Sequence, residues 1–105
     1  MALLTVAQFR VVPGKFQEFG ANVATAKKIH ERLGGRVRVW NAVVAGPNSG
    51  LVSYAIEHQD WASYASFNEK LATDSEWQQF AANVLQRADP SGLFQSAVLA
   101  NEITP

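Results

Sequence analysis

The feature that most constrains the fold is a change of hydrophobic period at Pro13-Gly14. From Leu3 to Val11 the side chains alternate between two faces, as in a β-strand. Proline is tolerated in the first turn of a helix but not in a central strand, and glycine permits a tight turn. Beyond this turn, apolar residues recur at the three-, four- and seven-residue spacing of a helix: Phe16, Phe19, Val23, Ala26 and Leu33. We expect this helix to end at Gly34-Gly35, where glycine suits the left-handed position after the last turn.

Two extended segments follow and predict a β-hairpin. The valine-rich run 36–45 and the run 51–58 are separated by the turn sequence GPNSG. A two-residue loop at Asn48-Ser49 would place Val39, Asn41, Val43 and Ala45 on one face with His58, Ile56, Tyr54 and Val52. The other face would hold Arg38, Trp40, Ala42 and Val44 with Ser53, Ala55 and Glu57. A one-residue change in the loop would regroup these sets.

The second half of the chain predicts two helices and a last strand. Asp60 and Asp74 are good N-caps for helices that carry Trp61, Tyr64 and Leu71, and then Trp77, Phe80, Val84 and Leu85, at helical spacing. We expect Trp61, Trp77 and the helical phenylalanines to lie in the core. Pro90 and Gly92 stop the second helix. A strand over 93–103 then places Leu93, Ala97, Leu99 and Ile103 on one side and Phe94, Val98 and Ala100 on the other.

The order of elements is β-α-β-β-α(α)-β, which predicts an α+β protein with one ferredoxin-like domain over residues 1–105. The expected antiparallel sheet has strand order 4-1-3-2, with all helices on one side. Its first and last strands are apolar on both faces, so the uncovered face would expose a large apolar patch. A homodimer that packs sheet on sheet is the simplest way to cover that face. The alternative is a monomer with scattered apolar residues on its surface.

Composition excludes several classes of function. Nine basic residues balance nine acidic ones, and no basic cluster exceeds a pair, so we expect no nucleic-acid partner. The chain has no cysteine, which removes disulfides and thiolate chemistry and fits a reducing, cytoplasmic location. No apolar run is long enough for a membrane helix. Two distant histidines make a metal site improbable, and no cofactor-binding motif occurs, so we expect neither a metal nor a cofactor.

Two stretches of the sequence resemble known families. FRVVPGKFQEF resembles the strand-to-helix turn of antibiotic-biosynthesis-monooxygenase-like proteins, and the segment from Trp40 to Phe80 resembles the NIPSNAP-like pattern. Both belong to the dimeric α/β-barrel superfamily, and the likeness covers roughly residues 4–103. It implies a homodimer in which two sheets form a dimeric α/β barrel, with a pocket in each subunit between sheet and helices.

That superfamily includes cofactor-free monooxygenases of polycyclic aromatics, haem-degrading enzymes and proteins with no assigned reaction. The haem-degrading subgroup relies on an Asn, a His and a Trp. This chain has Gln8 in the middle of its first strand and no histidine in its third helix, so that site is not carried over.

The candidate site residues include His30 and His58, which alone in this chain have ordinary pKa values near neutrality. If Asn41, Tyr54 and His58 line the helix-facing side of the sheet, His58 would be a base and the other two would orient a substrate. The alternative is that His58 is a surface residue at a strand end and Tyr54 an ordinary core aromatic. His30 is a further substrate-binding candidate beside the apolar stripe of the first helix.

A second cluster is expected on the opposite face of the hairpin. The two-residue loop would place Trp40 opposite Glu57, with Arg38 one step away. An ion pair beside an indole would suit the dimer interface better than a ligand site.

The function expected from these features is binding of a small, mostly apolar or aromatic molecule, with cofactor-independent oxidation or proton transfer if the protein is an enzyme. The competing interpretation is a non-catalytic structural or interaction module whose core is filled by its own side chains. A cavity between helices and sheet would distinguish the two.

Overall fold

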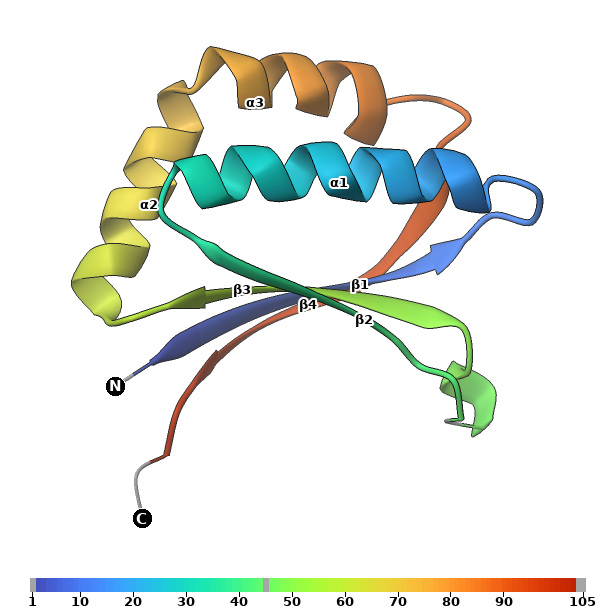
Figure 1. The fold of residues 1–105 in the computed structure, drawn as a ribbon, viewed down its shortest axis with the longest axis horizontal. Helices are drawn as coiled ribbons and strands as arrows, with labels where there is room; N and C mark the ends of the chain where they lie inside the picture. The colour runs from blue at the N-terminus through green and yellow to red at the C-terminus, as the bar shows by residue number, and fades with distance from the viewer. Residues whose placement is uncertain (1, 45, 104–105) are drawn as a thin grey trace.

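The fold was analysed in a computed structural model that describes residues 2–44 and 46–103. The chain is drawn in Figure 1. In order it forms β1 (Leu3–Val11), α1 (Phe16–Arg32), β2 (Arg36–Asn41), a 3-10 turn (Gly46–Asn48), β3 (Leu51–His58), α2 (Trp61–Thr73), α3 (Ser75–Phe80), a π-helical turn (Ala81–Leu85) and β4 (Gly92–Asn101).

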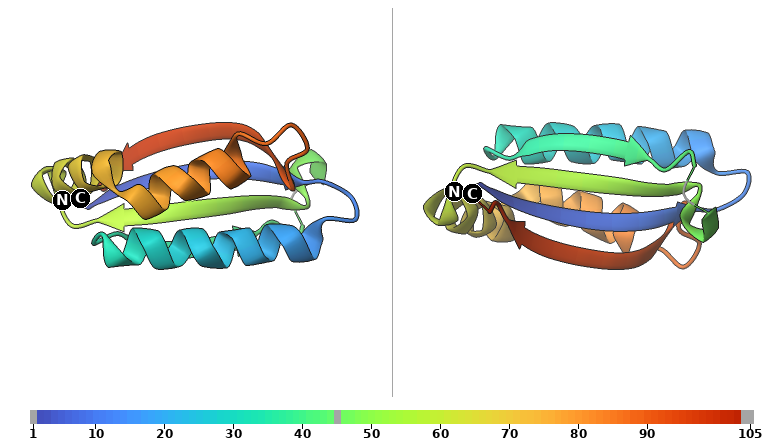
Figure 2. Two further views of the ribbon diagram at one scale, coloured as in Figure 1. Left: turned by 90° about the horizontal axis from the view of Figure 1, so that it is seen from above. Right: turned by 90° about the horizontal axis from the view of Figure 1, so that it is seen from below.

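The four strands form one antiparallel sheet in the order β2-β3-β1-β4, which confirms the predicted topology. In Figure 1, α1 and α3 lie above one face of the sheet, and α2 runs down beside one end of it. Seen from below in Figure 2, the strands lie in front and none of these three helices covers the second face. The sheet is open, with β2 and β4 at its edges, so a barrel would need a second chain and stays a prediction.

The hydrophobic core lies between α1, the middle of α2 and the centre of the sheet. Ala26 and Ile29 from α1 and Leu33 just after it pack with Val37, Tyr54, Ile56 and Phe67. The helix ends at Arg32, and the chain leaves it through Gly34, whose φ of 101° requires glycine. The backbone N–H of Gly35 then donates to the His30 carbonyl oxygen at 2.9 Å. A side chain at Gly35 would meet Ile56 Cγ2 at 2.7 Å, so this position lets the chain pass close beneath the helix.

Both predicted N-caps are present. The Asp60 carboxylate accepts from the backbone N–H of Ser63 at 2.8 Å, and the Asp74 carboxylate accepts from that of Trp77 at 2.8 Å. Arg32, at the end of α1, also donates to Asp74 at 2.9 Å, so one carboxylate starts α3 and ties it to α1. Two residues expected in the core are instead exposed, Phe16 and Trp61, because α1 and α2 turn these positions away from the sheet.

The predicted hairpin loop is wrong, although the faces of its strands are correct. The connection spans residues 42–50 and is closed by the Gly50 N–H, which donates to the Ala42 carbonyl oxygen at 2.7 Å. Pro47 cannot donate to a strand ladder, and Gly46 and Gly50 have positive φ, so the turn takes up more of the chain than two residues. Val39 pairs with Tyr54 and not with His58, a shift in register of four residues. Because side chains alternate between the two faces, an even shift leaves each residue on its predicted face. Ala45 falls outside the described residues.

The predicted faces of the last strand are wrong at its beginning. Phe94 pairs with Phe9 and the two rings meet edge to face at 5.9 Å, so Phe94 shares the helix-facing side with Ala97 and Leu99. Leu93 pairs with Arg10 on the opposite side. The cause is an irregularity in register between Gln8 and Phe9, where Gln95 is the unpaired extra residue of a β-bulge.

Candidate functional site

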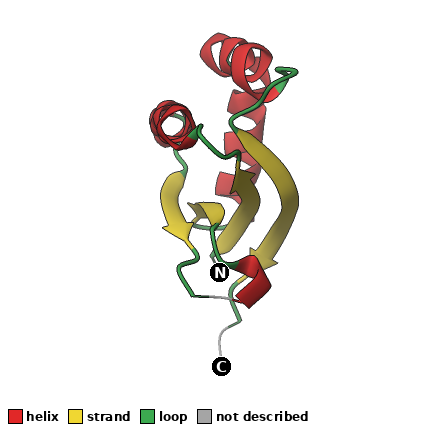
Figure 3. Cartoon of the chain, turned by 90° about the vertical axis from the view of Figure 1, so that its right-hand side faces the viewer, coloured by secondary structure: helices red, strands yellow, loops and turns green. Residues whose placement is uncertain are grey.

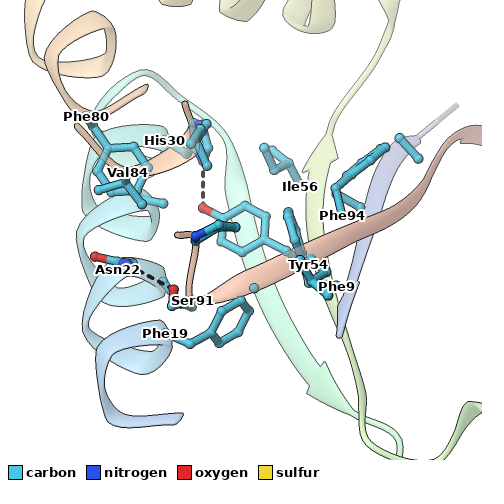
Figure 4. Close-up of a pocket in the computed structure, with 18 of the residues that line it drawn as sticks. Phe9, Phe19, Asn22, His30, Tyr54, Ile56, Phe80, Val84, Ser91 and Phe94 are labelled. Carbon is cyan, nitrogen blue, oxygen red and sulfur yellow. Dashed lines mark hydrogen bonds between the residues drawn. The ribbon is translucent and has the colours of Figure 1, made fainter. Parts of the chain in front are cut away.

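A cavity of about 550 Å³ lies between the helices and the sheet. We call it the helix–sheet cavity, and Figure 4 shows the side chains that line it. Its walls come from α1, β1, β3, β4, the residues just before β4, and the segment that runs from α3 through the π-helical turn. Most of them are apolar or aromatic, including Phe9, Phe19, Val23, Ala26, Ile56, Trp77, Phe80, Val84, Leu85, Phe94 and Ala97.

One end of the cavity holds a buried hydrogen bond between two candidate residues. Nδ1 of His30 and the hydroxyl oxygen of Tyr54 are 2.6 Å apart, as the dashed line in Figure 4 shows. His30 is 5% exposed, and its ring lies 4.5 Å from that of Trp77 between centroids. The α1 helix supplies the histidine and the second strand of the hairpin supplies the tyrosine, so the contact depends on the fold and not on sequence proximity.

Burial keeps both members of this pair uncharged at neutral pH. Desolvation, and secondly the charge of His58, lowers the pKa of His30 from 6.5 to about 4. Burial, and secondly the charge of Glu31, raises the pKa of Tyr54 above its ordinary value. A neutral imidazole and a phenol can each donate and accept hydrogen bonds, so this end of the cavity can bind either a hydroxyl or a carbonyl group.

A second polar pair lines the cavity further toward the start of α1. The Asn22 side-chain amide donates to the Ser91 hydroxyl oxygen at 3.2 Å, which Figure 4 also marks. Ser91 is buried, and its carbonyl oxygen accepts from the backbone N–H of Val12 at 2.8 Å. Neither residue was predicted from the sequence. Asn22 adjoins the apolar stripe of α1 and precedes His30 by eight positions, which was a usable signal, whereas Ser91 lies in a turn whose path the sequence does not define.

The structure brings Tyr54 and His30 into the helix–sheet cavity but not His58 or Asn41. His58 is buried at 2% exposure beneath α2, with its ring 4.8 Å from Phe67 and 5.2 Å from Tyr64. Burial lowers its pKa, and neither ring nitrogen has a hydrogen-bond partner among the described residues. It is therefore neither the surface residue of the alternative reading nor a residue that lines the cavity. Asn41 is exposed at the end of β2.

The predicted pairing of Trp40 with Glu57 is wrong. Trp40 lies opposite Ser53 and Arg38 opposite Ala55, while the residue across from Glu57 is Arg36. Arg36 and Glu57 form an exposed ion pair with 3.9 Å between Nη1 and Oε1. The longer hairpin connection causes this shift. Arg38, Trp40 and Glu57 still share the open face of the sheet, so a role at an interface stays a prediction.

Two further features bear on chemistry. In the part of the chain that the structure describes, no three histidine, cysteine or acidic residues are grouped so that they could hold a metal ion. Of the helices in residues 2–44 and 46–103, none has the length and apolar character to cross a bilayer.

Comparison with known proteins shows the fold. No protein-family model and no curated protein matches the sequence. Among solved structures, an uncharacterised NIPSNAP domain protein from Burkholderia xenovorans is 21% identical with a TM-score of 0.73, covering 96% of this chain and 94% of that one. A NIPSNAP family protein from Agrobacterium tumefaciens is 20% identical with a TM-score of 0.63, covering 94% and 82%. A provisionally named antibiotic biosynthesis monooxygenase from Bordetella bronchiseptica is 16% identical with a TM-score of 0.64, covering 98% of each chain.

The names of these structural neighbours are those of the two families that the sequence resembles, the NIPSNAP-like and the antibiotic-biosynthesis-monooxygenase-like proteins. At such identities the likeness establishes a shared ferredoxin-like fold. Fold alone does not determine activity.

Proposed function

We propose that this protein binds a small, mostly apolar or aromatic molecule in the helix–sheet cavity. The observation that carries the proposal is the cavity itself, about 550 Å³ in volume and walled by aromatic side chains. Pockets for small molecules are concave and mostly apolar, with a few convergent polar groups. Tyr54 and His30 supply such groups at one end.

The cavity counts against the alternative of a structural module with a filled core. Leu85 and Phe94 line the cavity and are 50% and 61% exposed, so it opens to solvent. Exposed apolar side chains around a concave space are typical of a binding site and have no role in a module that needs only stability. Binding explains both features together.

A second candidate is a cofactor-independent enzyme of the monooxygenase type. The hydrogen-bonded His30 and Tyr54 pair favours it, as does the fold shared with the provisionally named monooxygenase. His30 could accept a proton from a ligand hydroxyl while Tyr54 donates a hydrogen bond to a ligand carbonyl. A pKa of about 4 makes His30 a weak base, so binding is the better supported function.

Calorimetric titration with 2-naphthol tests the binding function. We expect saturable binding to the wild type and its loss in Ala97→Phe, which places a phenyl ring in the cavity from β4. The matched control is Ala24→Phe, on the exposed surface of α1, which should bind like the wild type. Absence of binding to the wild type, or equal binding by Ala97→Phe, would contradict the proposal.

Oxygen uptake with hydroxylated aromatics tests the enzyme function. If the pair takes part, turnover is expected in the wild type and should fall in Tyr54→Phe, which removes only the hydroxyl. No oxygen consumption across such a panel, in a protein that binds these compounds, would leave binding as the function.

We also propose that two copies pair through the open face of the sheet. Trp40 is 60% exposed on this face at the β2 edge, and Leu93 and Val98 are exposed on β4 at the opposite edge. Leu4 and Val6 are half-buried on β1, between these edges. Figure 3 shows the same sheet edge-on, with α1 and α3 on one side only. The centre of this face also holds the hydrogen-bonded side chains of Gln8, Ser53 and Ser96. A second copy offers an identical face, and covering it would remove its apolar side chains from water.

Sedimentation velocity at micromolar concentration tests the pairing. We expect a dimer for the wild type and a monomer for Val98→Glu, because a charge would then be buried unpaired. Val43→Glu, on the exposed connection between β2 and β3, is the matched control and should stay dimeric. A wild-type monomer would refute the pairing.

A further inference from the structure

The helix–sheet cavity has a polar pair at two separate places along α1. His30 and Tyr54 form one, and Asn22 and Ser91 form the other. Because α1 is a continuous helix, the eight positions between Asn22 and His30 correspond to roughly 12 Å along its axis. The two pairs therefore lie at separate places along the cavity, which extends past Asn22 as far as Phe19 (Figure 4).

The wall of the cavity carries no charge. Phe9, Phe19 and Phe94 form an aromatic side of the cavity, with Phe9 lying 6.0 Å from Phe19 and 5.9 Å from Phe94 between ring centroids. None of the described residues that line the cavity is Asp, Glu, Lys or Arg. A charged ligand would lose its hydration there without gaining an ionic partner, which is expensive.

The Asn22 and Ser91 pair retains unused hydrogen-bonding capacity. An asparagine side chain has two N–H donors and a carbonyl oxygen, and a single N–H is engaged with the Ser91 hydroxyl oxygen. The Ser91 hydroxyl hydrogen is in turn available to an acceptor. Ser91 is buried, so a ligand that reaches it meets a hydrogen-bonding group in a largely dry site, where such bonds discriminate strongly.

Given the binding function proposed above, on which this step rests, we infer that the ligand is an uncharged, elongated aromatic molecule with a hydrogen-bonding group at each end. Tyr54 and His30 bind one end, and Asn22 and Ser91 bind the other. Asn22 and Ser91 are thus the residues that set specificity for the second polar group.

Three matched probes test this inference by calorimetric titration. 2,6-Dihydroxynaphthalene has a hydroxyl at each end, 2-naphthol has one, and 6-hydroxy-2-naphthoate replaces one hydroxyl with a carboxylate. We expect the diol to bind the wild type about three- to tenfold more tightly than 2-naphthol, the worth of one hydrogen bond. The carboxylate should bind at least about tenfold more weakly than the diol.

Two variants assign the preference to the second pair. In Asn22→Leu and in Ser91→Ala the diol and 2-naphthol should bind within about twofold of each other. Asn68→Leu, the same change on the exposed surface of α2, is the control and should keep the preference. Ser91→Ala removes only a hydroxyl, so it reports on the inference even if Asn22→Leu folds poorly.

The outcomes separate this inference from the function on which it rests. If 2-naphthol does not bind the wild type, the proposed function fails and this inference fails with it. If 2-naphthol binds but the diol binds no more tightly, or if both variants keep the wild-type preference, only the two-ended ligand is refuted. Tighter binding of the carboxylate than of the diol would refute the uncharged class.

Discussion

The buried His30 should make the stability of the protein depend on pH in a predictable window. Its pKa is about 4 in the folded protein and 6.5 when exposed, so the unfolded chain takes up a proton at a higher pH than the folded one. The stability that goes with the neutral histidine is therefore complete above pH 6.5. It is lost as the pH falls from there toward 4.

The magnitude follows from proton linkage. Between pH 7 and pH 5 the unfolded histidine becomes almost fully protonated while the folded one stays about nine-tenths neutral, which corresponds to about 2 kcal/mol of lost stability. This window lies above the range in which the lowered pKa values of Asp60 and Asp74 matter. Burial also lowers the pKa of His58, which adds a change of the same sign.

Urea unfolding at pH 7 and pH 5, at one protein concentration, measures the effect in the wild type and in His30→Leu. We expect the wild type to lose about 2 kcal/mol more than the variant over this interval. The comparison cancels the contribution of His58 as long as its surroundings persist. An NMR titration of the His30 ring gives the pKa directly. A His30 pKa near 6.5, or an equal loss in both proteins, would refute the reasoning.

Three further predictions concern packing and caps. Gly92→Ala places a Cβ 2.4 Å from the ring of Phe19, so the ring must shift. We expect the free energy of unfolding in urea to fall by about 1–3 kcal/mol and 2-naphthol to bind more weakly. Unchanged stability would contradict this. Asp74→Ala should lower the unfolding free energy by about 1–2 kcal/mol, because it removes the N-cap of α3. Arg32→Ala should lower it by less than about 1 kcal/mol, because it removes only exposed ion pairs. A larger loss in Arg32→Ala than in Asp74→Ala would contradict this assignment. Ile29→Ala, at a side chain only 1% exposed, should cost about 2–5 kcal/mol and lower the melting temperature; a cost below 1 kcal/mol would mean that the site collapses around the lost volume.

The elements and topology of this fold could be predicted because they depend on local periodicity. Pro13-Gly14 and Gly34 mark the limits of α1, and Asp60 and Asp74 cap the helices that follow. The faces of the hairpin survived an error in its loop because a four-residue shift keeps the alternation in phase. The exposed positions of Phe16 and Trp61 were not predictable, since which side of a helix faces the sheet depends on tertiary packing.

The site was harder to predict because it depends on how α2 and α3 cross the sheet. His58 and Tyr54 share a face of β3, but the end of the strand lies beneath Phe67 of α2, and only Tyr54 reaches the cavity. His30 was considered beside the stripe of α1 but not as the partner of Tyr54. Their contact joins residues 24 positions apart, and no local pattern encodes it.

The β-bulge in β4 has a consequence for how this strand tolerates changes in length. Gln95 has no partner in the ladder with β1, and its side chain donates to the Leu93 carbonyl oxygen at 3.1 Å. Deleting this residue would leave Phe94 across from Phe9, so every side chain of the strand would keep its side. A deletion at Val98 would instead invert one flank of the strand. Insertions and deletions in descendants of this chain should therefore accumulate at Gln95 and spare the rest of β4.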